Sequence, residues 1–480
     1  MPMRFHFRPV VLPAVLALLL TACATRTAYY QDMDRMTAAG DYSRAAALAE
    51  ESREKVYGQK NALLYYLDRG MFLHLEGKYR ESNDAFEKAK ELADSYFTKS
   101  ITAEASTFLV NDTMRPYYGE DFERALINVF RALNYALLGM DREALVEARQ
   151  VDHFLTTLQS KYGHKNVYRE DAFVRYLMGM LYENCGEAND AYISYWKALE
   201  SYEEYARAYG VTAPARLAAD ALRLGRKLGM TDDVRELERK WGKSPETATG
   251  PGDAAGEIVV LHYNGQAPVK TDSFFEISFG RAWVHVEGMQ PQGEEAAQVE
   301  QARAIARSII ADEQVRMAFP RFTPRPYRIS DVKARVLTPA GSSSTGEAGA
   351  LVEDIGAIAV KNLDDRIARI RVRTIARAAI KYALSRRITD SVQKQNGEAL
   401  GWLVEKALSA ASAATELADK RSWRSLPDRI RMVRLPAEEG ACGVELSFLD
   451  ASGNVVERKT LGDVVVRRGR KTFVVVRTVY

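Results

Sequence analysis

The chain has 480 residues, of which 47% are hydrophobic and 27% charged, and its formal net charge is +3 at pH 7. This length and composition are typical of a globular protein of two or three domains, each large enough to bury a core of its own. The nearly balanced charge argues against nucleic acid as a partner, because a phosphate-binding surface needs a clear excess of basic residues.

Residues 1–22 form a predicted lipoprotein signal peptide. Arg4 and Arg8 supply its positive start, and the apolar run from Val10 to Leu20 is too short to span a bilayer. The run ends in Leu20-Thr21-Ala22-Cys23, which resembles the lipobox, where a peptidase cleaves before a lipidated cysteine. We therefore expect Cys23 to be the lipidated first residue of the mature protein. The alternative is an ordinary secretory signal with a chance cysteine at the cleavage site.

Lipidation at Cys23 also predicts where the protein resides. Several acyl chains anchor a protein firmly, since each buried CH₂ contributes about 0.8 kcal/mol. Ala24 follows the cysteine where some lipoproteins have aspartate, a pattern similar to that of proteobacterial lipoproteins sorted to the outer membrane. We expect a lipid-anchored, periplasm-facing protein of the outer membrane. The remaining cysteines, Cys185 and Cys442, fall in different predicted domains, so we expect two free, buried thiols.

Residues 23–242 are predicted to form a helical repeat domain. Glycine, then a small or aromatic residue, then alanine recur at the turns of helix hairpins in five copies, of which the fifth is degenerate. The pattern resembles the tetratricopeptide repeat (TPR), in which small residues lie where two helices cross closely. The turn glycines are Gly40, Gly77, Gly139, Gly186 and Gly229. Their separations of 37, 62, 47 and 43 residues exceed the usual repeat of about 34, so we expect an irregular solenoid, with a generic helical bundle as the alternative.

The second half of the chain has a different pattern. Residues 243–256 combine glycine, proline and small polar residues without apolar periodicity, which predicts a linker. Residues 257–480 predict an α+β domain with antiparallel strands. The expected strands are 257–263, 274–286, 327–337, 443–449, 455–461, and 464–467 paired with 472–479, with a turn at Asn264-Gly265 after the first. The expected helices are 294–311, 350–361, 365–388 and 398–420.

The predicted helix 365–388 has a basic amphipathic pattern. One side carries the apolar residues Ile375, Ala376, Ala379, Ile380, Ala383 and Leu384. The other side carries the basic residues Arg369, Arg373, Arg377, Lys381 and Arg387. A core-packed helix with a solvated charged face is the favoured interpretation, and contact with anionic lipid or acidic cell-wall polymer is the alternative. The small-residue run 408–418 is more typical of close helix packing than of membrane insertion.

Several short blocks carry a further resemblance. The blocks are Leu261-His262-Tyr263-Asn264-Gly265-Gln266-Ala267-Pro268-Val269-Lys270, Arg373-Thr374-Ile375-Ala376-Arg377-Ala378, Ser422-Trp423-Arg424-Ser425-Leu426-Pro427, Asn128-Val129-Phe130 and Asn134-Tyr135. Together they are similar to an uncharacterised family of TPR-containing lipoproteins of Gram-negative bacteria. The resemblance implies the same location and architecture for this chain, and it supplies no catalytic residues.

The sequence contains no motif that predicts catalysis. Five histidines follow the signal peptide, and none has the HExxH spacing or another typical of metal sites; GxSxG, P-loop and GxGxxG motifs are absent. His262 and Cys442 are a conceivable Cys-His pair, but both fall in predicted strands beside apolar neighbours, which favours a structural role. We therefore expect no enzyme activity, no metal and no cofactor.

These features predict a lipid-anchored scaffold of the cell envelope that binds other envelope proteins, lipoproteins among them, through a TPR-like groove. The sequence leaves its oligomeric state open. First helices of stacked hairpins line such a groove, and Asn128, Arg131 and Arg175 are the candidate partner-binding residues. Gly70, Ala132 and Gly179 are assigned to the close helix crossings instead. The alternative function is an enzyme or enzyme activator that acts on cell-wall or surface polysaccharide.

Overall fold

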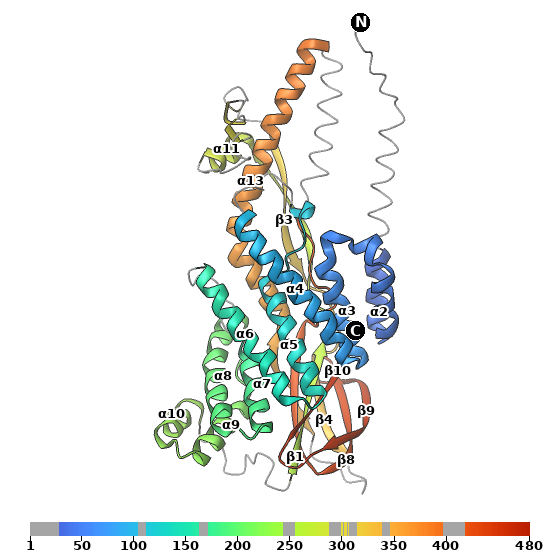
Figure 1. The fold of residues 1–480 in the computed structure, drawn as a ribbon, viewed down its shortest axis with the longest axis vertical. Coiled ribbons are helices and arrows are strands. Elements are labelled where there is room, and N and C mark those ends of the chain that lie inside the picture. The colour runs from blue at the N-terminus through green and yellow to red at the C-terminus, as the bar shows by residue number, and fades with distance from the viewer. Residues whose placement is uncertain are drawn as a thin grey trace.

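The computed structural model describes residues 28–103, 112–162, 171–242, 255–287, 299–300, 302–304, 306, 314–337, 346–396 and 418–480. Its N-terminal half is a row of helix hairpins (Figure 1). The helices are residues 28–38, α2 (Tyr42–Glu51), α3 (Ala62–Glu76), α4 (Tyr79–Ala103), α5 (Asp121–Leu137), α6 (Asp141–Tyr162), α7 (Ala172–Asn184), α8 (Ala188–Tyr209), α9 (Ala215–Lys227) and α10 (Thr231–Trp241), with short turns η1 (Arg53–Tyr57), η2 (Gln59–Asn61) and η3 (Asp112–Met114).

The five predicted turn glycines all end the first helix of a hairpin in the left-handed conformation, with φ between +69° and +85°. At Gly77, for example, the glycine N–H donates to the carbonyl of His74, and the next N–H, of Lys78, donates to Leu73. The same pair of bonds recurs at the other four glycines. This is the Schellman motif, which satisfies the free carbonyls at a helix end and favours glycine because a Cβ is strained there.

Within each hairpin the helices touch where the sequence places a small residue. A Cβ added to Gly70 would lie 2.6 Å from the ring of Phe86, sixteen positions later, and one added to Gly179 would collide with Tyr195 at the same separation. Ala132 and Ala148, again sixteen apart, are fully buried. The structural roles predicted for Gly70, Ala132 and Gly179 agree with these contacts.

The C-terminal half contains two four-stranded sheets, one on top of the other. The inner sheet has the order β10-β1-β7-β6, and the outer sheet has the order β5-β4-β8-β9. The strands are β1 (Ala255–Asn264), β4 (Asp331–Leu337), β5 (Glu347–Ala348), β6 (Ala350–Asp354), β7 (Arg429–Glu438), β8 (Gly440–Leu449), β9 (Val455–Val466) and β10 (Lys471–Thr478).

Strand β1 shows how the layers stack. Val259, Leu261 and Tyr263 point toward the repeat helices and belong to one core with them, whereas Ile258 and Val260 point toward the outer sheet. The strand is therefore buried on both faces, which accounts for its almost continuous apolar sequence. Helices, inner sheet and outer sheet therefore form three layers, and β1 belongs to the middle one.

A separate arm extends away from these layers, at the top of Figure 1. It consists of the hairpin β2 (Val269–Ser278) and β3 (Gln314–Thr323), the helix α11 (Phe279–Glu287) and the outer part of the long helix α13 (Ile355–Asn396). Ala376, Ala379, Ile380 and Ala383 bury the apolar side of α13 against α11 and β3, as expected for core packing. Arg377, assigned to the solvated side, is also buried.

Several helices and strands differ from those predicted from the sequence. Residues 279–286 continue as helix α11 rather than as strand, and residues 350–354 form strand β6 before α13 begins. Strands β3 and β7 were not predicted. The expected pairing of 464–467 with 472–479 does not form, because β10 crosses to the inner sheet and runs parallel to β1. Helix 398–420, most of helix 294–311 and the run 408–418 lie largely outside the described residues.

The boundary between the halves also differs from the prediction. Ala255 and Gly256 belong to β1 instead of the linker, and residues 243–254 of the predicted linker lie outside the described part, as do the signal peptide and Cys23. Helices and inner sheet share one continuous apolar core, so the two halves form a single packed unit. Over the described ranges, no helix is both long and apolar enough to cross a membrane.

Candidate functional site: the joint between repeats and sheet

The inner face of the repeats is covered by the chain's own C-terminal half. The first helices α3, α5 and α7 do line that face, as the repeat pattern predicts, and nearly every residue of α5 and α7 is buried. Strands β10, β1, β7 and β6 lie against them. The groove that a free TPR array would offer to another protein is therefore occupied intramolecularly.

Trp423 fills the centre of this joint. Its ring lies 5.7 Å from the rings of both Phe86 and Phe130 and is 1% exposed. The Trp423 main-chain N–H donates to Glu123 Oε1 at 2.6 Å, and its indole N–H donates to Ser425 at 2.9 Å. Burial raises the pKa of Glu123 to about 7, against the lowering effect of Lys270. Large aromatic rings contribute much of the apolar area at such contacts, so Trp423 anchors residues 421–426 to the repeats.

A second contact joins α3 to β1. His74 Nδ1 lies 2.6 Å from Asn134 Oδ1, and His74 Nε2 lies 3.1 Å from the hydroxyl of Tyr263. The Asn134 amide nitrogen donates to Ser82 and Asn83, which fixes its oxygen toward the imidazole. Nδ1 therefore carries the proton, and Nε2 accepts from Tyr263. Three blocks that carry the resemblance to TPR lipoproteins, around Tyr263, Asn134 and Trp423, thus meet at this joint.

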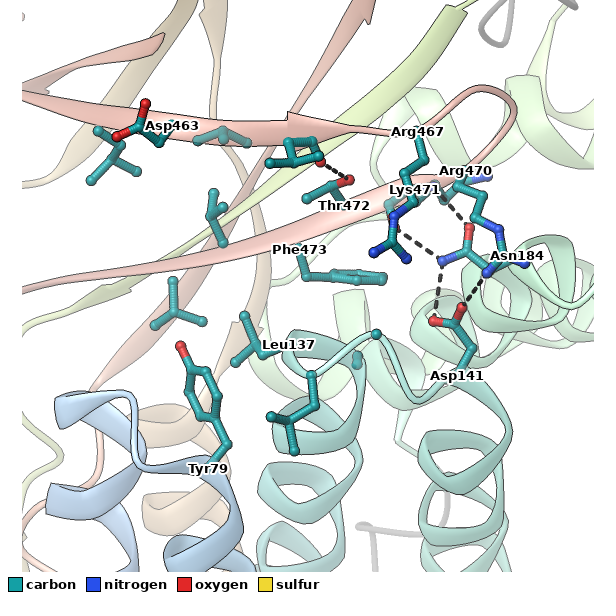
Figure 2. A pocket seen from close by; sticks show the side chains of 18 of the residues that line it. Tyr79, Leu137, Asp141, Asn184, Asp463, Arg467, Arg470, Lys471, Thr472 and Phe473 are labelled. Carbon is teal, nitrogen blue, oxygen red and sulfur yellow. Dashed lines mark hydrogen bonds and ion pairs between the residues drawn. The ribbon is translucent and has the colours of Figure 1, made fainter. Parts of the chain in front are cut away.

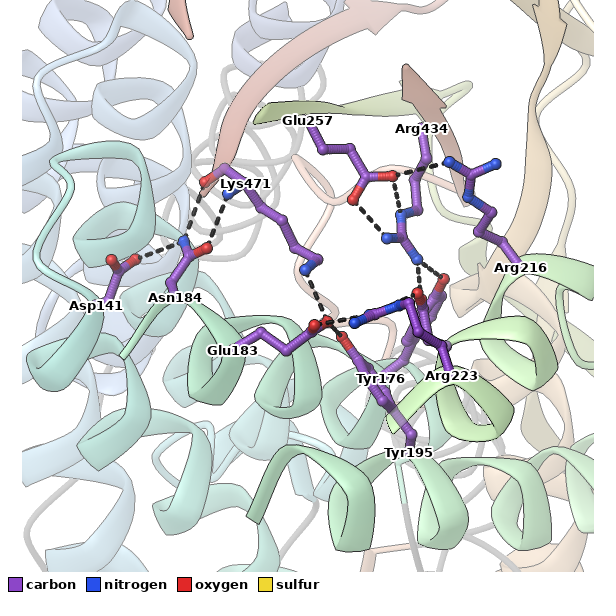
Figure 3. Close-up of polar contacts among 11 residues, drawn as sticks. Asp141, Tyr176, Glu183, Asn184, Tyr195, Arg216, Arg223, Glu257, Arg434 and Lys471 are labelled. Atoms are coloured by element: carbon purple, nitrogen blue, oxygen red, sulfur yellow. Dashed lines mark hydrogen bonds and ion pairs between the residues drawn. The ribbon is translucent and has the colours of Figure 1, made fainter. Parts of the chain in front are cut away.

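A buried ionic network closes the far side of the joint (Figure 3). Arg434 on β7 ion-pairs with Asp220 on α9 and with Glu257 on β1, and it donates to the hydroxyl of Tyr176 at 2.7 Å. Asp220 and Glu257 are 3% and 0% exposed. Although burial alone raises the pKa of Asp220, Arg434 and Arg223 hold it below its usual value. A charge buried this deeply is tolerated only when it is paired, so the network fixes the position of β7 on α9.

Lys471 continues the network along β10. Its Nζ lies 2.7 Å from Glu183 Oε2, and Glu183 also pairs with Arg223. The main chain of Lys471 is held by the side chain of Asn184, which donates to the Lys471 carbonyl at 3.0 Å and accepts from its N–H at 2.8 Å. Asn184 also donates to Asp141 at 3.2 Å. These contacts attach the first residue of β10 to the turn between α7 and α8.

Beside this attachment lies an open hollow of about 490 Å³ (Figure 2). One wall is the end of α5 with its turn, including Leu137, and the other is formed by residues 461–465 of β9 and 472–475 of β10. Arg467 points into one end, and Asp463 marks the opposite end. Arg467 is exposed and forms no ion pair with the residues that the structure describes, whereas neighbouring Arg470 pairs with Asp141 at 3.1 Å. The hollow is an accessible part of the joint.

Asp463 has an unusual backbone at this rim. Its φ is +56°, the one positive value at a non-glycine residue within the described ranges. Gly462 and Asp463 lie opposite Gly443, where the register between β8 and β9 shifts, so this conformation belongs to a β-bulge at the edge of the hollow.

The predicted partner-binding residues do not line an open groove. Asn128 and Arg131 are 4% and 8% exposed on α5, and Arg131 ion-pairs with Glu87 and Glu147. Arg175 on α7 pairs with Asp152 at 2.7 Å. All three side chains are enclosed by neighbouring helices or by the C-terminal half. An open groove would need a bare inner face, whereas the inner sheet covers that face and ion pairs hold Arg131 and Arg175 against neighbouring helices.

The residues that form the joint gave only weak signals in the sequence. Arg434 interrupts an apolar run in Val433-Arg434-Leu435, which is typical of a buried, paired charge. Asn184 and Lys471 gave no signal, because their partners lie about 290 positions away in the chain.

A second hollow, of about 440 Å³, lies between the end of α8 and the start of α13 and is lined by Asp354 and Asp428 among others. Burial raises the pKa of Asp428, which accepts a hydrogen bond from Tyr327 at 2.7 Å. Asp354 pairs with Arg429 and accepts from the N–H of Ala357 at the start of α13. Both carboxylates thus already hold local structure together.

The surroundings of the two thiols and of His262 are typical of structural residues. Cys185 and Cys442 are free, as the sequence predicts, but they are half-buried rather than buried. His262 is fully buried on β1, where its Nε2 lies 2.7 Å from the hydroxyl of Thr478. Burial lowers the pKa of His262 to about 3, so the ring is neutral at physiological pH.

Comparison with known proteins adds little to this geometry. No family model matches the chain, and no curated protein matches it. Among solved structures, it is similar to nearly identical TPR-like repeats of a protein from Podosopora anserina described as a kinesin light chain; the sequences are 15% identical, the match covers 45% of this chain and 92% of that one, and the TM-score is 0.29. A likeness this distant does not identify a family or a function for this chain. The hairpins, their Schellman turns and their small-residue crossings themselves define a TPR-like helical repeat protein with an appended two-sheet unit.

Proposed function

We propose that the protein is a scaffold of the cell envelope, anchored through a lipid on Cys23 to the outer membrane and facing the periplasm, which binds other envelope proteins. The lipobox-like sequence before Cys23 supports the anchor. The TPR-like hairpins support protein binding, since stacked repeats present extended surfaces to partners.

One observation moves the binding surface away from the inner groove. Strands β10, β1, β7 and β6 fill that groove, and the 490 Å³ hollow beside β10 remains open. The hollow combines apolar residues, such as Leu137 and Phe473, with charged residues at its ends, and a mixture of apolar surface and placed polar groups is typical of recognition sites. We therefore assign partner binding to the hollow between Leu137, Asp463 and Arg467 instead of to Asn128, Arg131 and Arg175.

The alternative, an enzyme or enzyme activator for cell-wall or surface polysaccharide, gains little from the second hollow. A catalytic carboxylate has to reach a substrate, but Asp354 and Asp428 are engaged in ion pairs and hydrogen bonds of the fold. We expect no catalysis by this protein.

Photo-crosslinking in membranes tests the assignment. A benzoylphenylalanine at Gly462, where an added side chain meets no atom within 4 Å, should crosslink partner proteins identified by mass spectrometry. The same group at Val146, which is 53% exposed on α6, is the matched control. Equal capture from both positions, or capture from Val146 alone, would overturn the assignment to the hollow.

A further inference from the structure

The hollow contains a free strand edge. Within the described part of the chain, β10 pairs with β1 and has no strand on its other side. The carbonyls of Arg470 and Thr478 accept from Glu257 and Gly265 beside β1, so the even-numbered residues direct their main-chain groups to β1. Because successive residues of a strand point these groups to opposite sides, Lys471, Phe473 and Val475 direct theirs to the open side.

Asn184 occupies the first position of this edge in the manner of a strand. Its side-chain amide donates to the Lys471 carbonyl and accepts from the Lys471 N–H, as a paired strand would. The next outward positions, Phe473 and Val475, line the hollow instead. An open edge of this kind is a template for another extended chain.

The ends of the hollow differ in charge, because Arg467 and Arg470 outnumber Asp141 at one end and Asp463 marks the other. Arg467 lies where β10 begins, and Asp463 lies farther along the strand (Figure 2). A segment that runs antiparallel to β10 would bring its C-terminal end to Arg467 and its N-terminal end to Asp463. Tyr79 and Leu137 line the helical side of the same hollow and offer contact area for apolar side chains.

We propose that the edge of β10 binds an extended peptide segment of a partner protein by strand addition, antiparallel to β10. The segment has apolar side chains in its centre and ends in a carboxylate, either a chain terminus or an acidic side chain, at Arg467. This inference rests on the proposed function and specifies the chemistry of the partner at the same site.

Fluorescence anisotropy tests the inference with a labelled peptide, Lys-Thr-Val-Thr-Val-Glu, and the full mature protein. The peptide should bind, and N-methylation of its alternate amides should weaken binding at least about tenfold, because methylation removes the main-chain donors. Arg467→Glu should weaken binding about tenfold. Lys459→Glu, an exposed charge reversal elsewhere on β9, should leave binding unchanged.

A backbone variant supplies an independent test. Val475→Pro removes a main-chain donor that faces the hollow and leaves the bonds to β1 in place, so it should abolish peptide binding with an unchanged circular dichroism spectrum. Equal binding of the N-methylated peptide would overturn strand addition. Occupation of the edge by a second copy, detected as sedimentation of a dimer that Val475→Pro dissociates, would also overturn it.

The scaffold function and the strand addition at β10 can be refuted independently of each other. If Gly462 still captures partners in membranes while Val475→Pro and Arg467→Glu have no effect on that capture, the scaffold function stands and strand addition is wrong. If Gly462 captures nothing and the peptide still binds, the edge is a binding site but the assignment of partner recognition in the envelope is wrong.

Discussion

His74 and Tyr263, separated by 189 positions in the chain, stack with ring centroids 5.6 Å apart and an interplanar angle of 17°. With the proton of the neutral imidazole on Nδ1, the Tyr263 hydroxyl donates to His74 Nε2. Burial lowers the pKa of His74 to about 4, because the charged imidazolium is poorly solvated in this joint between repeats and sheet.

The first prediction follows from this pKa. The unfolded chain binds a proton near pH 6.5 and the folded protein binds it only near pH 4, so the free energy of unfolding should fall as the pH drops through this window, by up to about 1.4 kcal/mol per pH unit from His74. His74→Gln should reduce that slope in urea unfolding, and His153→Gln, at an exposed position, should not. Identical slopes for wild type and His74→Gln would refute the buried neutral imidazole.

The second prediction concerns the ionic network. Arg434→Met leaves Asp220 and Glu257 buried without their main partner and should lower the free energy of unfolding by about 3–5 kcal/mol. Arg235→Met removes an arginine whose side chain is 73% exposed and should cost less than about 1 kcal/mol. Urea denaturation followed by tryptophan fluorescence measures both. Similar losses in the two variants would mean that the network does not hold the halves together.

The third prediction concerns the helix crossings. Gly179→Ala places a methyl group against the ring of Tyr195, which must move, and should destabilise the protein by about 1–3 kcal/mol. Gly179→Leu should unfold the hairpin. Gly346→Ala has nearly open space around it and is the control for glycine replacement itself. Thermal unfolding of the variants by circular dichroism separates them, and an unaffected Gly179→Ala would contradict the crossing.

The fourth prediction concerns the predicted linker. Limited proteolysis should cut first between Lys243 and Ala254, since the sequence there lacks the apolar periodicity that accompanies burial. The two fragments should then elute together in gel filtration, because helices and inner sheet share one core. Fragments that separate without denaturant would show two independent domains instead.

The fifth prediction concerns the anchor. Cys23→Ser should release the protein from membranes or leave an unprocessed precursor, because the acyl chains supply the membrane affinity. Fractionation of membranes and soluble extract, with the mass of the mature N-terminus, measures this outcome. Membrane retention of the cleaved, unlipidated variant would contradict lipid anchoring.

The sequence by itself determined the local structure of the repeats. Each turn glycine, such as Gly77 or Gly186, occupies a left-handed position that few other residues adopt, and each small residue at a crossing, such as Gly70, excludes a side chain there. These constraints act within a few turns of helix, so the amino-acid pattern records them directly.

Only the tertiary structure decided what the repeats face. Asn128 and Arg131 have the sequence character of groove residues, yet both are buried, and Arg131 is held between α4 and α6 by its ion pairs with Glu87 and Glu147. Likewise, β10 follows β9 after a short turn but pairs with β1, where Phe473 and Val475 pack in the core shared with the helices and Val474 and Val476 pack in the core shared with the outer sheet. Such contacts join residues hundreds of positions apart, and neither helical nor strand periodicity carries information about a partner so distant in the chain.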